Sequence, residues 1–287
     1  MNDPTHTVTK LLEEVEECLD YLRDVHINSG SITGTVLEKA RSCVSNRLSI
    51  VRGLGLKTNH AYILGLSVTD GRFLRKRKIR LEFSTTRASF VHVILSLPFS
   101  YRVYLDRVLV RDGKLIPHLM FITYDETVRE LYTSYEVLSR FADSIINKEV
   151  DFQKSNLRKF VTYIKERARD NIEDILGALD FLKTEDDFIE LLAGLLDGDG
   201  VVTKSRHVAI AVAPLTRNNR PNMKGLVVLI LVSLIESLLN IEFTNYVPSD
   251  RKLYISTRSL KRLNQRLIDK IVHPEKRERL SRIIRHN

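Results

Sequence analysis

The sequence predicts an α+β protein that contains two copies of one αββαββα unit, accompanied by helical segments. The first observation is a nine-residue pattern that occurs twice, at residues 63–71 and 192–200. Four of its nine positions agree, since Gly65, Leu66, Asp70 and Gly71 recur as Gly194, Leu195, Asp199 and Gly200. The second observation is that the same order of strand and helix patterns follows each copy. We therefore expect two related units with pseudo-two-fold symmetry.

Residues 1–58 show only helical spacing and form the first expected segment. One apolar stripe includes Leu11, Val15 and Leu19, and a later stripe runs from Val36 to Val51. Seven basic and eight acidic side chains give this segment a net charge of −1. A small helix-turn-helix-like module is one interpretation. The charge and the absence of a clear three-helix pattern favour the other, a helical cap on the first unit.

The first unit covers residues 59–142 and begins with the helix that carries the first nine-residue pattern. Alternating apolar and polar residues then predict strands at 72–75 and 78–85, and a helix follows at 88–97. Two further strands, at 101–110 and 115–124, and a helix at 127–141 complete the unit.

A helical connector at residues 143–184 leads into the second unit, at residues 185–287. Thr184, followed by three acidic residues, predicts the start of a helix that ends at the second nine-residue pattern. The patterns after it predict strands at 201–204 and 206–212, a helix at 223–239, strands at 241–247 and 252–256, and helices at 257–271 and 275–285.

The repeated Asp-Gly pair marks the chemistry of this chain. A helix that stops at glycine places Asp199 beside carbonyl groups that have no partner within the helix. Carboxylate and carbonyl oxygens suit Mg²⁺, so Asp70 and Asp199, with the neighbouring Thr69 and Gly198, predict a divalent-metal site. A single Asp-Gly pair is usually only a helix stop, but the repetition favours the metal.

The run Leu-Ala-Gly-Leu-Leu-Asp-Gly-Asp-Gly at 192–200 resembles the LAGLIDADG motif of homing endonucleases and differs from it only at Leu196 and Gly198. The first copy departs further, since Leu64 stands at the alanine position and Val68 at the first aspartate. The resemblance covers residues 59–142 and 185–287. It implies a single chain with a saddle-shaped antiparallel sheet, built from two pseudo-symmetric homing-endonuclease units.

The resemblance also implies roles for particular residues. The two motif helices would pack side by side at Gly65, Gly194 and Ala193, because their backbones approach closely only where side chains are small. That packing would bring Asp70 and Asp199 together as the catalytic pair, which holds Mg²⁺ or Mn²⁺. In the resembling enzymes a basic residue polarises the scissile phosphate, and Lys276 or Arg277 is the best match here.

Basic side chains are concentrated in the two units. Residues 59–142 carry 13 basic and 8 acidic side chains, and residues 191–287 carry 17 and 8. This distribution indicates a polyanionic partner. Strand alternation and loop composition predict the side chains that contact double-stranded DNA, namely Arg75, Lys78, Arg80, Arg102, Lys204, Arg206, Arg220 and Lys252. Each of these residues could also belong to a merely solvated face.

Composition excludes several classes of protein. The longest apolar run, residues 225–235, is too short to span a bilayer, so we expect no membrane segment. The first residues lack the pattern of a secretory signal, which favours an intracellular protein. Cys18 and Cys43 are then expected to be reduced core residues without chemistry. The only glutamines are Gln153 and Gln265, a low number that is compatible with a thermophilic source.

These observations together predict a monomeric, metal-dependent endonuclease that cleaves both strands of a specific DNA site. The alternative is a nucleic-acid binder that uses the same scaffold without cleavage. Such a binder would be a group I intron maturase acting on intron RNA or a transcription regulator that resembles the WhiA family. Paired carboxylates favour the nuclease, since a pure binder does not need them next to phosphates.

Overall fold

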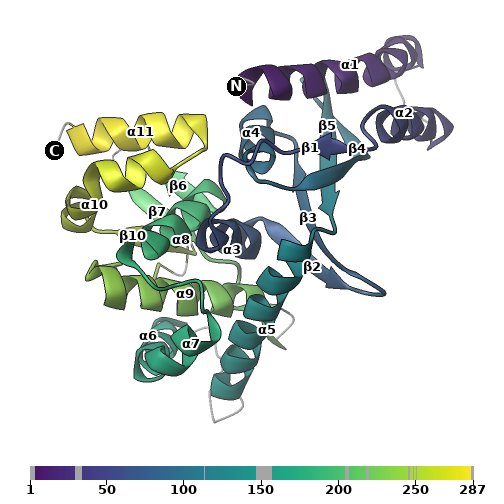
Figure 1. Ribbon diagram of the computed structural model, residues 1–287. Coiled ribbons are helices and arrows are strands. Elements are labelled where there is room, and N and C mark those ends of the chain that lie inside the picture. Colours follow the sequence, from purple (N-terminus) through teal and green to yellow (C-terminus); the bar gives the residue numbers. More distant parts are fainter. Residues whose placement is uncertain are drawn as a thin grey trace. The chain divides into compact units, whose positions relative to one another are not determined.

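The structure is a computed structural model that describes residues 4–29, 34–112, 114–146, 157–203, 207–217, 220–244, 246–247, 249 and 251–285. It confirms the α+β class, with a five-stranded and a three-stranded antiparallel sheet (Figure 1). The chain forms two compact units. Unit 1 comprises residues 1–58 and 71–129, and unit 2 comprises residues 59–70 and 130–287. The helix that carries the first motif therefore belongs to unit 2.

Unit 1 is built on the five-stranded sheet, whose order is β1-β4-β5-β3-β2. The strands are β1 (Val51–Arg52), β2 (Gly71–Arg75), β3 (Ile79–Thr85), β4 (Ser100–Arg111) and β5 (Lys114–Thr123). Strands β2 to β5 begin and end within one residue of the predicted bounds. Strand β1 was not predicted, because Val51 was assigned to a helical stripe. It pairs with Tyr101 at the edge of the sheet instead.

Alternation along the strands builds the core of unit 1. Leu81 and Phe83 on β3 and Phe121 on β5 are fully buried. The ring of Tyr101 lies edge-on to that of Phe121, and its hydroxyl donates to the Ile94 carbonyl in α4 (Ala88–Ser96). The apolar face of the sheet is thereby joined to α4, as the period-two pattern predicts.

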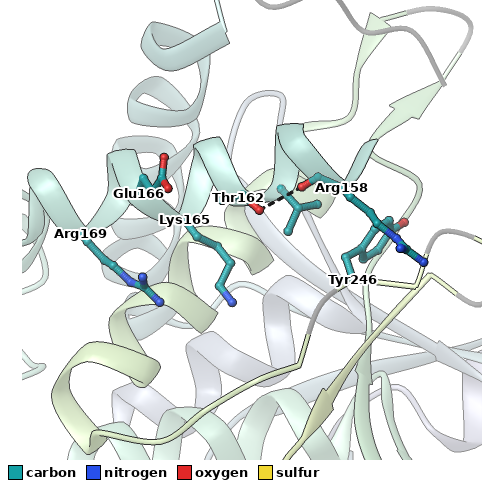
Figure 2. A pocket seen from close by; sticks show the side chains of 7 residues that line it. Arg158, Thr162, Lys165, Glu166, Arg169 and Tyr246 are labelled. Carbon is teal, nitrogen blue, oxygen red and sulfur yellow. Dashed lines mark hydrogen bonds between the residues drawn. The ribbon is translucent and has the colours of Figure 1, made fainter. Parts of the chain in front are cut away.

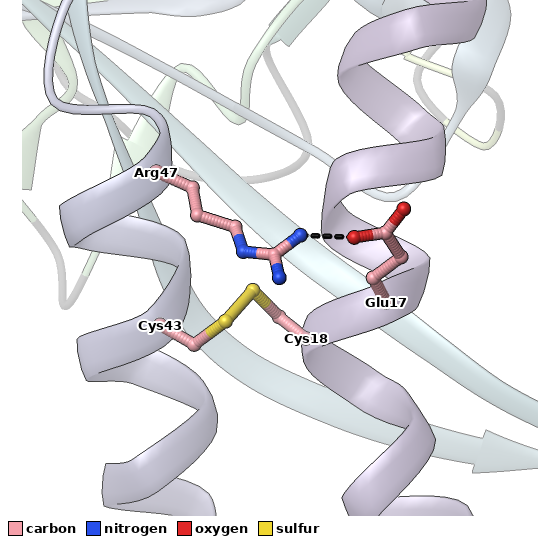
Figure 3. The surroundings of a disulfide bond; sticks show 4 residues. All are labelled: Glu17, Cys18, Cys43 and Arg47. Carbon is pink, nitrogen blue, oxygen red and sulfur yellow. Dashed lines mark hydrogen bonds and ion pairs between the residues drawn. A yellow bond between two sulfur atoms is a disulfide. The ribbon is translucent and has the colours of Figure 1, made fainter.

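The N-terminal segment forms two helices, α1 (Pro4–Ser29) and α2 (Gly34–Arg47), which pack against the rest of unit 1. Arg41 on α2 donates to the carbonyls of Leu105 and Asp106 on β4. The expectation of reduced cysteines is wrong, because Cys18 and Cys43 form a disulfide between the two helices (Figure 3). An ion pair between Arg47 and Glu17 lies beside it. No spacing pattern indicated this bond, because it depends on how α1 and α2 pack.

Reducing the disulfide should destabilise unit 1. The bond closes a loop of 25 residues, and a loop of this size contributes about 3 kcal/mol through the unfolded chain. Cys18→Ser with Cys43→Ser should therefore lower the melting temperature, and a reductant should do the same to the wild type. Thermal unfolding followed by circular dichroism measures both effects. A reductant that shifts the double variant as much as the wild type would contradict the assignment.

Unit 2 is mainly helical. Its centre is α3 (His60–Thr69), α8 (Glu185–Asp197) and α9 (Met223–Leu239), which pack on one another and are buried along most of their lengths. The surrounding helices are α6 (Leu157–Asp170), α7 (Ile172–Ala178), α10 (Thr257–Lys270) and α11 (Pro274–Arg285). Helix α5 (Glu126–Ile146) begins in unit 1 and continues into unit 2. The bounds of α9 match the predicted helix. Its apolar run, which only Ser233 interrupts, is buried on all sides.

The small sheet of unit 2 has the order β10-β7-β6, with β6 (Gly200–Val202), β7 (Val208–Ala211) and β10 (Lys252–Ile255). The predicted strand at residues 241–247 is wrong. Its described residues, 241–244 and 246–247, form no continuous strand and make two isolated antiparallel bridges to β10, Phe243 to Ile255 and Val247 to Lys252. The two bridges are four residues apart on this segment and three residues apart on β10, so they do not belong to one regular ladder.

Between β7 and α9, a short two-stranded ribbon forms from β8 (Thr216–Arg217) and β9 (Arg220–Pro221). The strands after the two motif helices therefore form sheets of different size.

Candidate functional site

Helices α3 and α8 lie side by side within unit 2 and run parallel. At their N-termini, the Asn59 side chain accepts from the Ala61 amide and donates to Asp187 Oδ1 at 3.2 Å. Asp187 in turn completes a capping box with Thr184, the predicted N-cap. Each cap thus starts its own helix, and one hydrogen bond between the caps sets the register of the pair.

The closest approach of the two helices is at Gly65 and Gly194. A Cβ atom on Gly65 would lie 2.4 Å from the Leu191 carbonyl oxygen, and one on Gly194 would lie 2.1 Å from that of Tyr62. The contact is reciprocal, since each glycine meets the carbonyl three residues before the other. Only glycine permits this backbone contact at either position. Ala193, the third residue predicted for this interface, is fully buried.

The same register brings the two motif aspartates together at the C-terminal ends of the helices. Asp70 is the C-cap of α3, and Gly198 is the C-cap of α8. A Cβ atom on Gly198 would lie 1.9 Å from Thr69 Oγ1 and 2.6 Å from Asp70 Oδ2. The missing side chain of Gly198 therefore makes room for Thr69 and Asp70 against the end of α8.

Asp70 and Asp199 are close enough to interact electrostatically. Burial, together with the neighbouring Asp70 carboxylate, raises the pKa of Asp199 to about 6, while Lys224 and Lys276 oppose the shift. Two like charges in a partly buried site disfavour full ionisation. This arrangement favours a cation at that place, because a cation would relieve the repulsion.

Lys276 also lies at this end of α8. Its Nζ donates to the carbonyl oxygens of Leu196 at 2.8 Å, Asp197 at 2.8 Å and Gly198 at 2.6 Å. This corrects one expectation, since the carbonyls that were expected to await a metal already accept from an ammonium group. A lysine binds there because the last helical carbonyls lack amide donors and carry partial negative charge. Thr69 was also expected to contribute to the metal site, but its hydroxyl donates to the carbonyl oxygens of Gly65 and Leu66 in its own helix.

Asp197, the first aspartate of the motif, is a structural residue. Its buried carboxylate accepts from the Tyr62 hydroxyl at 2.7 Å and from the amides of Val272 at 2.7 Å and His273 at 3.1 Å. Burial raises its pKa, and these hydrogen bonds lower it. The network ties α3 and α8 to the segment that carries Lys276. The first motif has Val68 at this position.

The donor set fits Mg²⁺ or Mn²⁺, because Mg²⁺ commonly takes one or two protein carboxylates and fills its other positions with water and substrate phosphate. Asp70 and Asp199 would supply those carboxylates. Within the described part of the chain, no group of three or more histidine, cysteine, aspartate or glutamate side chains could hold a metal. The described residues therefore do not form a site in which protein side chains alone coordinate the metal.

A second group of predicted residues gathers on unit 1. Lys78, Arg80 and Arg102 line a hollow of about 760 Å³ together with Lys76, Arg77 and Tyr124. Arg80 pairs with Glu82 at 2.8 Å and is hydrogen-bonded to the side chain of Tyr124. Glu82 alternates with the buried Leu81 and Phe83 along β3, but it is itself only 8% exposed, and it forms the ion pair with Arg80.

The other predicted DNA contacts are more dispersed. Arg75 is the exposed last residue of β2, beside the turn to β3. Lys252 is on β10 of unit 2, where buried and less buried residues alternate as predicted. Lys204 and Arg206 lie outside the described residues, and for Arg220 only the backbone, in β9, is described.

Three residues of these sites were not found from the sequence. Lys224 was missed, although it is one of two charged residues in the apolar helix α9. A lysine in an otherwise apolar helix could have indicated a residue of the site. Tyr124 was predicted only as the last residue of a strand, and its exposure of 46% was not predicted. Asp197 was read only as a motif letter, because its partners are far away in the sequence.

No protein-family model matches the chain, and no curated protein matches its sequence. Among the described residues, no helix is long and apolar enough to cross a membrane. The geometry of the site is therefore the basis for any assignment of function.

Proposed function

We propose that this protein is a metal-dependent endonuclease of the LAGLIDADG type that cleaves both strands of a DNA site. The observation that carries the proposal is the pairing of Asp70 and Asp199 at the ends of two parallel helices that meet through glycines. The repeated motif, the reciprocal contact and the raised pKa of Asp199 all support it. The whole-chain pseudo-symmetry and the saddle-shaped sheet belong to the same proposal.

The proposed roles follow from the contacts. Asp70 and Asp199 would hold the divalent cations at the scissile phosphates. When bound, such cations supply positive charge for the leaving 3′ oxygen and lower the pKa of water. Lys276 and Lys224 place positive charge near Asp199, which favours its ionised form. Asp197 positions the segment that carries Lys276.

The basic hollow on unit 1 would bind the DNA. Its five cationic side chains suit phosphates, and arginine can also read guanine edges in the major groove. We further propose a monomer that acts inside the cell. A disulfide is unusual there except in hyperthermophiles, and the scarcity of glutamine agrees with such a source.

The second function is non-cleaving binding, to DNA as a regulator or to intron RNA as a maturase. The basic hollow with Tyr124 would serve either role. The partly buried like-charge pair favours cleavage, because two neighbouring carboxylates destabilise a protein that never binds a cation there.

Selection from a library of randomised duplexes tests the proposal. The full chain is incubated with the library and Mg²⁺, and cleaved ends are captured and sequenced. We expect one family of long sites, cut on both strands, and no cleavage when EDTA replaces Mg²⁺. Bound sites without cleavage under both conditions would support the binding alternative instead.

Alanine at Lys78, Arg80 and Arg102 should weaken binding to the selected duplex. The slope of log affinity against log salt concentration should also fall, by about one for each phosphate that is no longer neutralised. Fluorescence anisotropy across a salt series measures both. The matched control is truncation of Leu81 or Phe83, which face the core and should cost about 2–5 kcal/mol of stability instead. If the basic set affects only intron RNA, the maturase alternative holds.

A further inference from the structure

Helix α6, in the predicted connector, carries a basic pocket whose lining includes none of the residues of the motif site or of the basic hollow. The cavity measures about 190 Å³ and is lined by Arg158, Val161, Thr162, Lys165, Glu166, Arg169 and Tyr246 (Figure 2). Three of these side chains are cationic and come from one helix. All of the lining residues belong to unit 2.

The cations lie along one face of the helix. Arg158, Lys165 and Arg169 are separated by seven and four residues, which are close to whole numbers of helical turns. At 1.5 Å per residue, the separations along the axis are about 10 Å and about 6 Å. The row is too long for a single phosphate to touch every cation. It suits a ligand with several anionic groups in succession.

A buried acid fixes two of the cations. Glu236 on α9, whose side chain is 5% exposed, accepts from Lys165 Nζ at 2.8 Å and pairs with Arg169 Nη2 at 3.2 Å. The same carboxylate accepts from the amide of Phe243, three residues before Tyr246. Glu236 therefore links α6 to the segment before Tyr246. Lys165 and Arg169 are held in place before any ligand binds, and each retains further N–H donors.

The charges of the pocket leave an excess of one positive charge. Arg158, Lys165 and Arg169 face two acids, Glu166 and Glu236, and Glu236 is covered by its own partners. Arg158 extends toward Tyr246 at one end of the pocket (Figure 2). Burial raises the pKa of Tyr246, and the positive charge of Arg251 opposes this effect.

We propose that this pocket binds a chain of successive phosphate groups, with Arg158 as the accessible contact and Lys165 and Arg169 as preorganised ones. Guanidinium and ammonium groups bind phosphate oxygens through charge-assisted hydrogen bonds. The shared chemistry is that of a nucleic-acid backbone or a free polyphosphate. The inference does not depend on the proposed nuclease activity, because it concerns different residues and needs no cleavage.

Isothermal titration calorimetry of the full chain with tripolyphosphate, in EDTA and low salt, tests the site. We expect saturable binding that Arg158→Ala weakens at least fivefold. Arg158 is an exposed side chain at the helix start, so the variant should fold. The control is Arg167→Ala on the same helix, since Arg167 lies over the Tyr163 ring outside the pocket and should change affinity less than twofold.

A second titration with an eight-nucleotide oligothymidylate identifies the source of the phosphates. It uses a chain with alanine at Lys78, Arg80 and Arg102, so that the basic hollow of unit 1 does not contribute. If Arg158→Ala weakens both ligands, the pocket accepts a nucleic-acid strand, and if it weakens only tripolyphosphate, the pocket accepts free polyphosphate. Absence of binding by the wild type, or equal losses in the Arg158 and Arg167 variants, would overturn the proposal.

Discussion

Gly194→Ala is expected to destabilise the protein by about 3 kcal/mol or more, at the upper end of what overpacking costs. The added Cβ would lie 2.1 Å from the Tyr62 carbonyl oxygen and 2.9 Å from the Leu66 amide nitrogen. Both are backbone atoms, so no side-chain rotation relieves the overlap. The helices α3 and α8 would have to separate, and separation would expose residues that are now fully buried. Urea unfolding followed by circular dichroism measures the change.

Gly177→Ala is the matched control, because it also adds one methyl group to a helical glycine. An added Cβ at Gly177, in α7, meets no atom within 4 Å. It should leave stability unchanged or increase it by up to about 1 kcal/mol, since alanine favours the helix. If Gly194→Ala unfolds at the same urea concentration as the wild type, the backbone contact between α3 and α8 is refuted.

Asp199→Asn is expected to abolish cleavage and at the same time to stabilise the fold. Asparagine keeps the shape of the side chain but removes the charge that would hold the cation. The duplex affinity measured in EDTA should change little, because the carboxylate itself does not attract phosphate. Cleavage of the selected duplex and anisotropy in EDTA separate these two effects. A variant that cuts at the wild-type rate would remove Asp199 from the proposed mechanism.

The stabilisation should depend on pH in a defined direction. The pKa of Asp199 is about 6 in the folded protein, above its ordinary value near 4, so the folded state holds the proton more tightly. The associated stability is present below pH 4 and is lost as pH rises through 6. Asp199→Asn avoids this loss and should exceed the wild type at pH 8 by on the order of 1–3 kcal/mol.

The two proteins should converge as the pH falls toward 4, where the wild-type carboxyl is protonated. Asp180→Asn, at an exposed position, is the control for loss of an aspartate charge. Urea unfolding at pH 4, 6 and 8 provides the measurement. A variant that is less stable than the wild type at pH 8 would show that Asp70 does not repel Asp199 as described.

Local sequence patterns were sufficient to predict most helices and strands and to single out Asp70 and Asp199. The apolar run of α9, the Thr184 cap and the alternation of β3 and β5 each depend on neighbours within a few positions, so they could be read directly. The repeated motif predicted that Asp70 and Asp199 lie together. Its glycines pointed to a helix contact, because a conformationally costly residue inside a helix needs a packing reason.

Long-range packing decided the rest. The disulfide, the Lys276 cap on α8 and the bonds from Tyr62 to Asp197 join positions between 25 and 135 residues apart. The isolated bridges of Phe243 and Val247 to β10 likewise form only when the two segments pair. No periodicity records such contacts, because they follow from how finished helices and strands pack. The sequence therefore determined which elements form and which two aspartates follow the motif helices, and the tertiary structure decided which groups surround these aspartates.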